Sequence, residues 1–402
     1  MSIQDKFRRL STDDAPGQEV RQSCDADFLL GEPLNGRVVD FSHGDVDAHK
    51  PTPGAFEVFA AGVEEGGAQA YTEYRGRADI RDTLAIRLAE FTGAPVDAKE
   101  GLIITPGTQG ALFLAIASTV SRGDKVAIVQ PDYFANRKLV EFFEGKMVPV
   151  QIAYQGAAEH EAGLNLDQLD AAFRNGAKLF LFSNPNNPAG VVYSAEEIDR
   201  IATLAANYGA TVIVDQLYYR LLFEGAAYTH LRAQPAVENI VTIMGPSKTE
   251  SLSGYRLGVA FGPADIIARM EKLQAIVSLR APGYSQAVLR TWFNEPEGWM
   301  ANRIRQHQAI RDDLITLFRQ IPGCAVRVPQ AGSYLFPSLP DLAIEPSDFV
   351  KALRLQADVI VTPGTEFSPH TPGSVRLNFS QDHAAAVAAV ERLAALVERY
   401  RA

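Results

Sequence analysis

Five short apolar segments, each separated from the next by sequence with helical character, constrain the fold of this chain more than any other feature. They are residues 102–105, 125–129, 178–182, 211–214 and 240–244. Strands that alternate with helices pack into a parallel sheet, because each connection has to cross over from one end of the sheet to the other. The sequence therefore predicts an α/β fold with a mainly parallel sheet covered by helices.

Each of the five segments is followed, within a few residues, by a residue that can contact a ligand. In order along the chain these are Gly107 with Thr108, Tyr133, Asn187, Asp215 and Lys248. Open α/β sheets bind ligands beyond the carboxyl ends of their strands, so we expect these residues to meet in one site. A glycine turn before an apolar helix offers backbone N–H groups to a phosphate, and a partly desolvated lysine can attack a carbonyl to form a Schiff base. Together they suit a flat, phosphorylated pyridine aldehyde.

Each residue also has an ordinary structural interpretation. A lone lysine after a strand is most often a solvated surface residue. Tyr133 is equally compatible with the core, and Tyr71 and Tyr74 with ordinary packing. Arg376, on an apolar strand at 374–379, either binds a carboxylate ligand or forms an internal ion pair. The shared position at strand ends favours a common site.

Length, charge and cysteine content limit the class of protein. A chain of 402 residues is long enough for two domains. Its net charge of −10 argues against a nucleic-acid or anionic-membrane surface, and no run reaches the roughly 18 apolar residues of a membrane span. Cys24 and Cys324 are far apart and the seven histidines lack metal-ligand spacing, so we expect no disulfide framework and no metal, in a cytoplasmic protein.

The remainder of the chain is expected to form the second domain. We predict an arm and the start of a helix before residue 35, and helical sequence again after Gly258. A long amphipathic helix is expected from about Trp292 to Pro322. The last 80 or so residues alternate short strands with helices, which indicates a smaller α/β domain.

Four ordered motifs now point to a family. They are N-P-x-N-P-x-G at 184–190, D-x-x-Y at 215–218, S-K-x7-R at 247–256 and the arginine strand at 374–379. From about residue 38 to 400 the chain resembles the class I and II aminotransferases, pyridoxal-phosphate enzymes of fold type I in the aspartate-aminotransferase superfamily. The resemblance implies a large domain with a mainly parallel seven-stranded sheet between helices and a smaller α/β C-terminal domain. It places an arm and part of the small domain at 1–45, the large domain at 46–290 and the small domain at 291–402.

The resemblance also implies a role for each motif residue toward pyridoxal phosphate. Lys248 looks like the Schiff-base lysine and general base, and Asp215 like the partner of the pyridine nitrogen. Asn187 and Tyr218 would bind the ring oxygen, and Tyr133 would stack on the ring. The residues that would hold the phosphate are Gly107, Thr108, Gln109, Ser247 and Arg256, with Tyr71 from the neighbouring subunit.

For the substrate, the resemblance implies an amino acid and a 2-oxo acid whose α-carboxylate binds Arg376, Asn187 and the backbone of Gly44. It also implies a homodimer with shared active sites. Three positions depart from the commoner family pattern, namely Gln216, Gly245 and Ala189. None of them is Lys248, Asp215 or Arg376. We therefore expect them to adjust the properties of the site and not to change whether the cofactor is used.

The predicted function is transfer of an amino group from an α-amino acid to a 2-oxo acid. A β-lyase, cyclase, oxidase or hydroxylase on the same scaffold remains an alternative, because such enzymes keep nearly all of these residues. The sensor domain of a transcription regulator is disfavoured, since only about 35 residues precede the resemblance. Arg280 either binds a distal carboxylate or lies on the surface, while Glu73 and the nearby tyrosines would favour a cationic or aromatic side chain.

Overall fold

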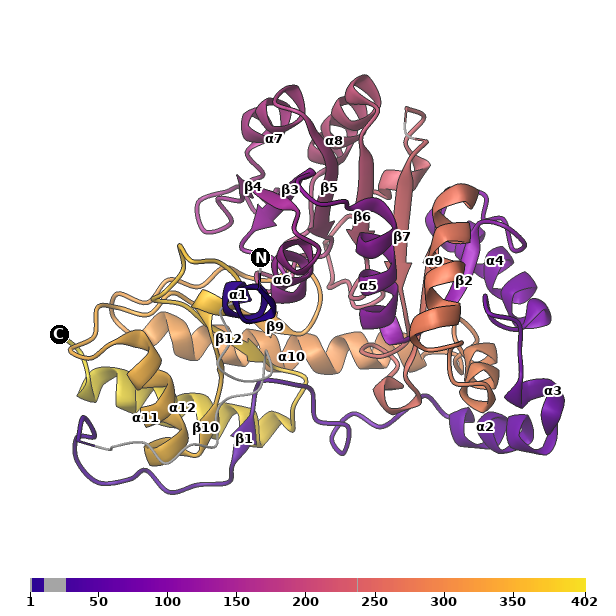
Figure 1. Cartoon of the computed structure of the whole chain (residues 1–402). Coiled ribbons are helices and arrows are strands. Elements are labelled where there is room, and N and C mark those ends of the chain that lie inside the picture. Colours follow the sequence, from indigo (N-terminus) through magenta and orange to yellow (C-terminus); the bar gives the residue numbers. More distant parts are fainter. Residues whose placement is uncertain (1, 11–26, 237) are drawn as a thin grey trace.

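The computed structural model describes residues 2–10, 27–236 and 238–402. Figure 1 shows one large sheet with helices on both sides, and a smaller group of helices and short strands beside it. The long helix α10 (Trp299–Gln320) runs along the boundary between the two. It covers most of the stretch in which a long amphipathic helix was expected.

The large sheet has seven strands. In spatial order they are β2 (Leu102–Pro106), β8 (Leu257–Phe261), β7 (Ile240–Met244), β6 (Thr211–Asp215), β5 (Ala177–Ser183), β3 (Lys125–Gln130) and β4 (Lys146–Gln151). Only β8 runs antiparallel to its neighbours, and the pairs among β3 to β7 are parallel. The predicted fold class is confirmed, and all five predicted strands are present.

Two strands differ from the expectation drawn from the residues. Helical sequence was expected directly after Gly258, but residues 257–261 form β8, with every residue buried. A five-residue apolar run is too short for a helix and fits a strand that is covered on both faces. Strand β4 gave no clear signal, because Pro149 interrupts it and only Val150 is buried; a proline of this kind is tolerated on an edge strand.

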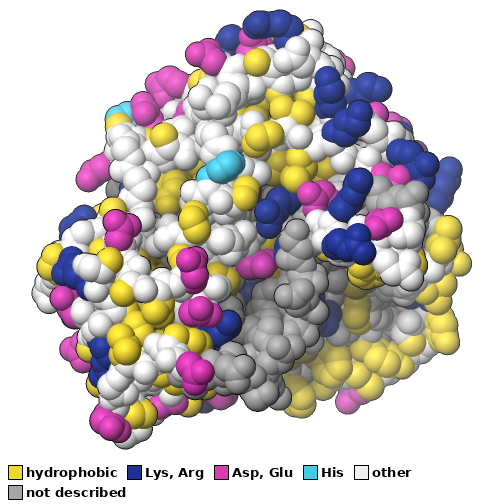
Figure 2. Space-filling view, turned by 60° about the vertical axis from the view of Figure 1, so that its left-hand side comes forward, with side chains coloured by type: hydrophobic (Ala, Val, Ile, Leu, Met, Phe, Trp, Pro, Cys, Tyr) yellow, Lys and Arg dark blue, Asp and Glu magenta, His cyan; other side chains and the backbone are white. Residues whose placement is uncertain are grey.

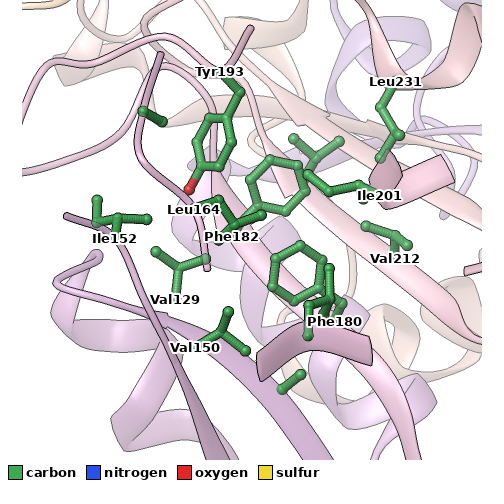
Figure 3. Packing of buried hydrophobic residues seen from close by; sticks show 14 of the residues in the cluster. Val129, Val150, Ile152, Leu164, Phe180, Phe182, Tyr193, Ile201, Val212 and Leu231 are labelled. Carbon is green, nitrogen blue, oxygen red and sulfur yellow. The ribbon is translucent and has the colours of Figure 1, made fainter. Parts of the chain in front are cut away.

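Side chains of each inner strand alternate between the two faces of the sheet. On β3, the side chains of Val126 and Ile128 lie on one face of the sheet. There they pack against the helices α5 (Gly107–Thr119), α6 (Phe134–Phe142) and α9 (Ala264–Val277). The side chain of Val129 lies on the other face, in a core that also contains residues of α7 (Leu166–Arg174) and α8 (Ala195–Tyr208). Figure 3 shows Val129 in this core beside Val150. Burying a side chain of this size stabilises the fold by about 1.5–3 kcal/mol, so both faces hold the strand ends in place.

The small domain has its own core. Its elements are α10, α11 (Pro346–Ala357), α12 (His383–Arg399), β1 (Val39–Asp40), β9 (Tyr334–Leu335), β10 (Val359–Ile360), β11 (Thr362–Pro363) and β12 (Val375–Asn378). Because β1 pairs with β10, residues 39–40 join the C-terminal part of the chain. We keep the domain boundaries near residues 45 and 290 as a proposal.

The remaining helices lie at the edges of the large domain, except for η4 (Gly364–Glu366), which lies between β11 and β12 of the small domain. The others are α1 (Ile3–Arg9), α2 (Ala55–Glu64), α3 (Gly67–Ala70), α4 (Ala78–Thr92) and the short helices η1 (Leu231–Ala233), η2 (Ser253–Tyr255) and η3 (Tyr284–Arg290). Phe7 of α1 packs edge-on against Phe142 of α6, and Cys24 lies outside the described residues.

The surface carries both signs of charge. On the face drawn in Figure 2, basic and acidic side chains are interspersed. Within the described part of the chain, no helix is both long enough and apolar enough to cross a membrane.

Candidate active site

A cavity of about 520 Å³ opens beyond the carboxyl ends of the parallel strands. Ten of the predicted site residues line it: Thr108, Gln109, Tyr133, Asn187, Asp215, Tyr218, Ser247, Lys248, Arg256 and Arg376. Nine come from the large domain, at or close to the ends of its strands or in the first turn of α5, and Arg376 comes from β12 of the small domain. The cavity therefore joins the two domains, and the predicted convergence of the strand ends is present in the fold.

The N-terminus of α5 forms one end of the cavity. No side chain caps this helix, so the N–H groups of its first turn are left for another acceptor. Gly107 has φ 75°, and a Cβ there would lie 2.7 Å from Nη2 of Arg256. A Cβ on Gly258 of β8 would lie only 2.4 Å from the backbone nitrogen of Thr108. Two glycines thus allow an arginine and a helix N-terminus to converge, which is an arrangement that binds phosphate.

Asp215 lies at the opposite side, at the end of β6. One of its oxygens accepts a hydrogen bond from the backbone N–H of Leu217 at 3.0 Å. Burial raises the pKa of this carboxyl to about 6. Among the described residues no lysine, arginine or histidine forms an ion pair with it, so a protonated ring nitrogen of a ligand would supply the missing positive charge.

Between these two ends, the cavity is lined by tyrosine rings and polar side chains. The hydroxyl of Tyr133 donates to the side-chain oxygen of Gln109 at 3.0 Å. Tyr218 and Tyr334 share a hydrogen bond of 2.5 Å between their hydroxyls. Burial would raise the pKa of Tyr334, but the positive charges of Arg376 and Lys248 lower it. Tyr334 was not assigned a role from the sequence, although it follows the turn at Ala331–Gly332 that ends near the site.

Lys248 and Arg376 are two further cations that line the cavity. Lys248 is half-buried in the loop after β7, and no carboxylate among the described residues pairs with it. Arg376 donates to the side-chain oxygen of Asn187 at 3.1 Å and to the carbonyl of Ser42 at 3.2 Å. Its buried Nε has no hydrogen-bond partner within the described ranges, and no carboxylate there pairs with its guanidinium. The internal ion pair considered from sequence is thus absent from the described residues.

Three predicted residues do not line this cavity. Gly107 lies under the guanidinium of Arg256, and Gly44 lies in an adjoining pocket beside the Asp40–His43 pair. From that segment it is Ser42 that reaches the cavity. Tyr71 is 78 % exposed on the outside of this chain, with the guanidinium of Arg280 5.1 Å from its ring centre.

Known proteins resemble this chain over most of its length. Residues 37–393 match the family model described as aminotransferase class I and II. The chain belongs to the class I and II aminotransferases. This aminotransferase is 71 % identical to a crystal structure of an aspartate aminotransferase from Rhodobacter sphaeroides 2.4.1, with a TM-score of 0.96 and full coverage of both chains.

Curated relatives support the same assignment. An aspartate aminotransferase from Sulfolobus acidocaldarius is 27 % identical over 90 % of both proteins. An asparagine–oxo-acid transaminase from Streptococcus mutans is 27 % identical over 84 % of this chain and 86 % of its own length. This protein is therefore an aminotransferase that acts by transamination, and the lyase, cyclase and oxidase alternatives are not favoured.

Proposed function

We propose that this aminotransferase binds pyridoxal phosphate in the cavity and that Lys248 is its attachment point. The convergence of Lys248, Asp215 and Arg256 in one cavity carries the proposal. The uncapped N-terminus of α5 with Arg256 fits the phosphate, and the half-buried Asp215, which has no cationic partner among the described residues, fits the ring nitrogen. Asn187 and Tyr218 would contact the ring oxygen, and Tyr133 would cover the ring.

Pyridoxal phosphate, when bound, draws electrons away from the substrate's α-carbon and so makes its proton acidic. The protein has to hold the substrate and move that proton. Arg376, fixed by Asn187 and Ser42, has donors left for the α-carboxylate and sets the direction of the α C–H bond. Lys248 Nζ then accepts the α-proton as general base, a role that typically contributes about 10²- to 10⁴-fold in rate.

We further propose that the amino donor is a dicarboxylic amino acid such as aspartate. The relatives named above support this class, since two of the three are aspartate aminotransferases. A dicarboxylate needs a cation beyond Arg376. Arg280 is a candidate because its Nε is buried without a partner in the described part of the chain, while its guanidinium lies over Tyr71 and Tyr74.

A homodimer would bring Arg280 and Tyr71 to the partner's cavity. Large apolar side chains that neighbour Arg280 in the sequence are exposed on a single chain, namely Val277 at 59 % and Leu279 at 46 %. Exposed apolar surface of this kind is typical of an interface. The prediction of a cytoplasmic protein stays a prediction that rests on the two cysteines.

The substrate proposal is tested with Arg280→Ala and a matched control, Arg269→Ala, whose arginine pairs with Asp265 on the exposed side of α9. We expect the first variant to raise the KM for aspartate at least tenfold, while the KM for alanine changes little, because only aspartate has a distal carboxylate. Equal KM values for aspartate in the wild type and Arg280→Ala would refute the role of Arg280. Wild-type turnover of alanine but not of aspartate would refute the dicarboxylate class.

A further inference from the structure

A second buried carboxyl lies directly behind the aromatic wall of the cavity. Asp132 immediately precedes Tyr133 and is 2 % exposed. Its oxygens accept hydrogen bonds from the backbone N–H of Tyr133 at 2.6 Å, and from the hydroxyl and N–H of Ser183 at 2.6 and 2.9 Å. The side-chain amide of Asn136 is a weaker donor at 3.4 Å. Within the described residues no ion pair with a lysine or arginine neutralises Asp132.

The contacts of Asp132 extend to other site residues. The hydroxyl of Ser183 donates to Asp132 and accepts a hydrogen bond from the backbone N–H of Asn187 at 3.0 Å. Ser183 is also the register partner of Asp215 across β5 and β6. Asp132 therefore connects the turn after β3, which carries Tyr133, to the turn that carries Asn187. Through Ser183 it is also linked to the strand position beside Asp215.

Asp132 also lies close enough to Asp215 for the charge of Asp215 to act on it. Burial raises the pKa of Asp132 to about 7, and the negative charge of Asp215 contributes to the rise. Burial also raises the pKa of the Tyr193 phenol, and the charge of Asp132 adds to that rise. Because Asp132 has the higher pKa of the two carboxyls, it is already protonated where Asp215 titrates, so the charge of Asp215 acts on Asp132 and not the reverse.

We propose that Asp132 is a positioning residue of this active site: its hydrogen bonds with the N–H of Tyr133 and with Ser183 fix Tyr133 and Asn187 around the ring site. The proposal rests on the proposed binding of pyridoxal phosphate, since Tyr133 and Asn187 would contact its ring. A proton held by Asp132 leaves Asp215 free to ionise and receive a positively charged ring.

The coupling is measured in the protein without cofactor. Aspartate carboxyl carbons are followed by NMR against pH, and Asp215 is assigned with Asp215→Asn. Asp132 is assigned with Asp132→Asn. Because Asp132 has the higher pKa, it is already protonated where Asp215 titrates. We therefore expect Asp215→Asn to lower the pKa of Asp132, while Asp132→Asn changes the pKa of Asp215 little. An unchanged pKa of Asp132 in folded Asp215→Asn would overturn the placement of Asp132 beside Asp215.

The positioning role needs a second readout. Ser183→Ala keeps both carboxyls but removes the bridge to Asn187, so we expect it to weaken pyridoxal phosphate binding about fivefold. It should also raise the pKa of Asp132, because the carboxylate loses a hydrogen bond. Wild-type affinity in Ser183→Ala would overturn this part. Failure of the proposed function has a different signature: the wild-type protein would not bind pyridoxal phosphate at all, whatever the carboxyl titrations show.

Discussion

Replacing Gly258 with alanine is a direct test of the phosphate end of the cavity. A Cβ there would lie 2.4 Å from the backbone nitrogen of Thr108 and 2.5 Å from the carbonyl carbon of Gly107. Ordinary contact begins at 3.4 Å, so β8 and the first turn of α5 must separate by about 1 Å. Both neighbours are backbone, so no side-chain rotation can relieve the clash. We expect a loss of about 1–3 kcal/mol in the free energy of unfolding.

The same shift should weaken phosphate binding. A displacement of 1 Å is enough to break a hydrogen bond from the helix N-terminus, and each such bond to a charged group contributes about 1.5–3 kcal/mol, or roughly 10- to 150-fold in affinity. The assay compares binding of pyridoxal phosphate with binding of pyridoxal, which lacks the phosphate. The matched control is Gly156→Ala, because a Cβ at Gly156 meets nothing within 4 Å. An equal loss of affinity for both ligands in Gly258→Ala would refute a phosphate site at α5.

Three further substitutions test the roles of Arg376, Asp215 and the buried ion pairs of Arg220. Arg376→Lys should raise the KM for amino acid and 2-oxo acid together, by about 10- to 100-fold, because a lysine cannot replace a forked guanidinium; a change in only one KM in steady-state kinetics would contradict this. In the cofactor-free protein the raised pKa of Asp215 favours its protonated form, so urea unfolding should show stability lost as pH rises toward about 6, and the loss should be smaller in Asp215→Asn, in which only other raised carboxyls such as Asp132 and Glu250 contribute. Arg220→Ala should cost about 3–5 kcal/mol in the free energy of unfolding, since Glu250 and Glu295 would be left buried without their shared cation; a loss below 1 kcal/mol would contradict it.

The sequence was most informative for polar and ionisable side chains that come directly after a predicted strand. Lys248, Asp215 and Asn187 each come after an apolar run, and the carboxyl ends of parallel strands necessarily share one edge of the sheet. Their meeting in one cavity could therefore be anticipated without knowing the strand order. Arg376 was anticipated in a different way, because an arginine among apolar strand residues needs a specific partner.

Other features depend on contacts that no local pattern reveals. Tyr334 reaches Tyr218 only because β9 of the small domain packs beside the loop after β6. Ser42 replaces Gly44 at the cavity because the pairing of β1 with β10 fixes where that loop turns. Asp132 was assigned no role from the sequence, and its contact with Ser183, 51 positions later in the chain, appears only in the fold.

The central claim is that Lys248 carries the cofactor and the proton transfer. The most direct measurement is the visible absorbance of the wild type and Lys248→Ala with pyridoxal phosphate, before and after aspartate and then a 2-oxo acid are added. We predict that aspartate bleaches the wild-type band and the 2-oxo acid restores it, while Lys248→Ala retains cofactor but shows no turnover. Normal turnover in Lys248→Ala, or a wild-type protein with no cofactor band, would contradict the account.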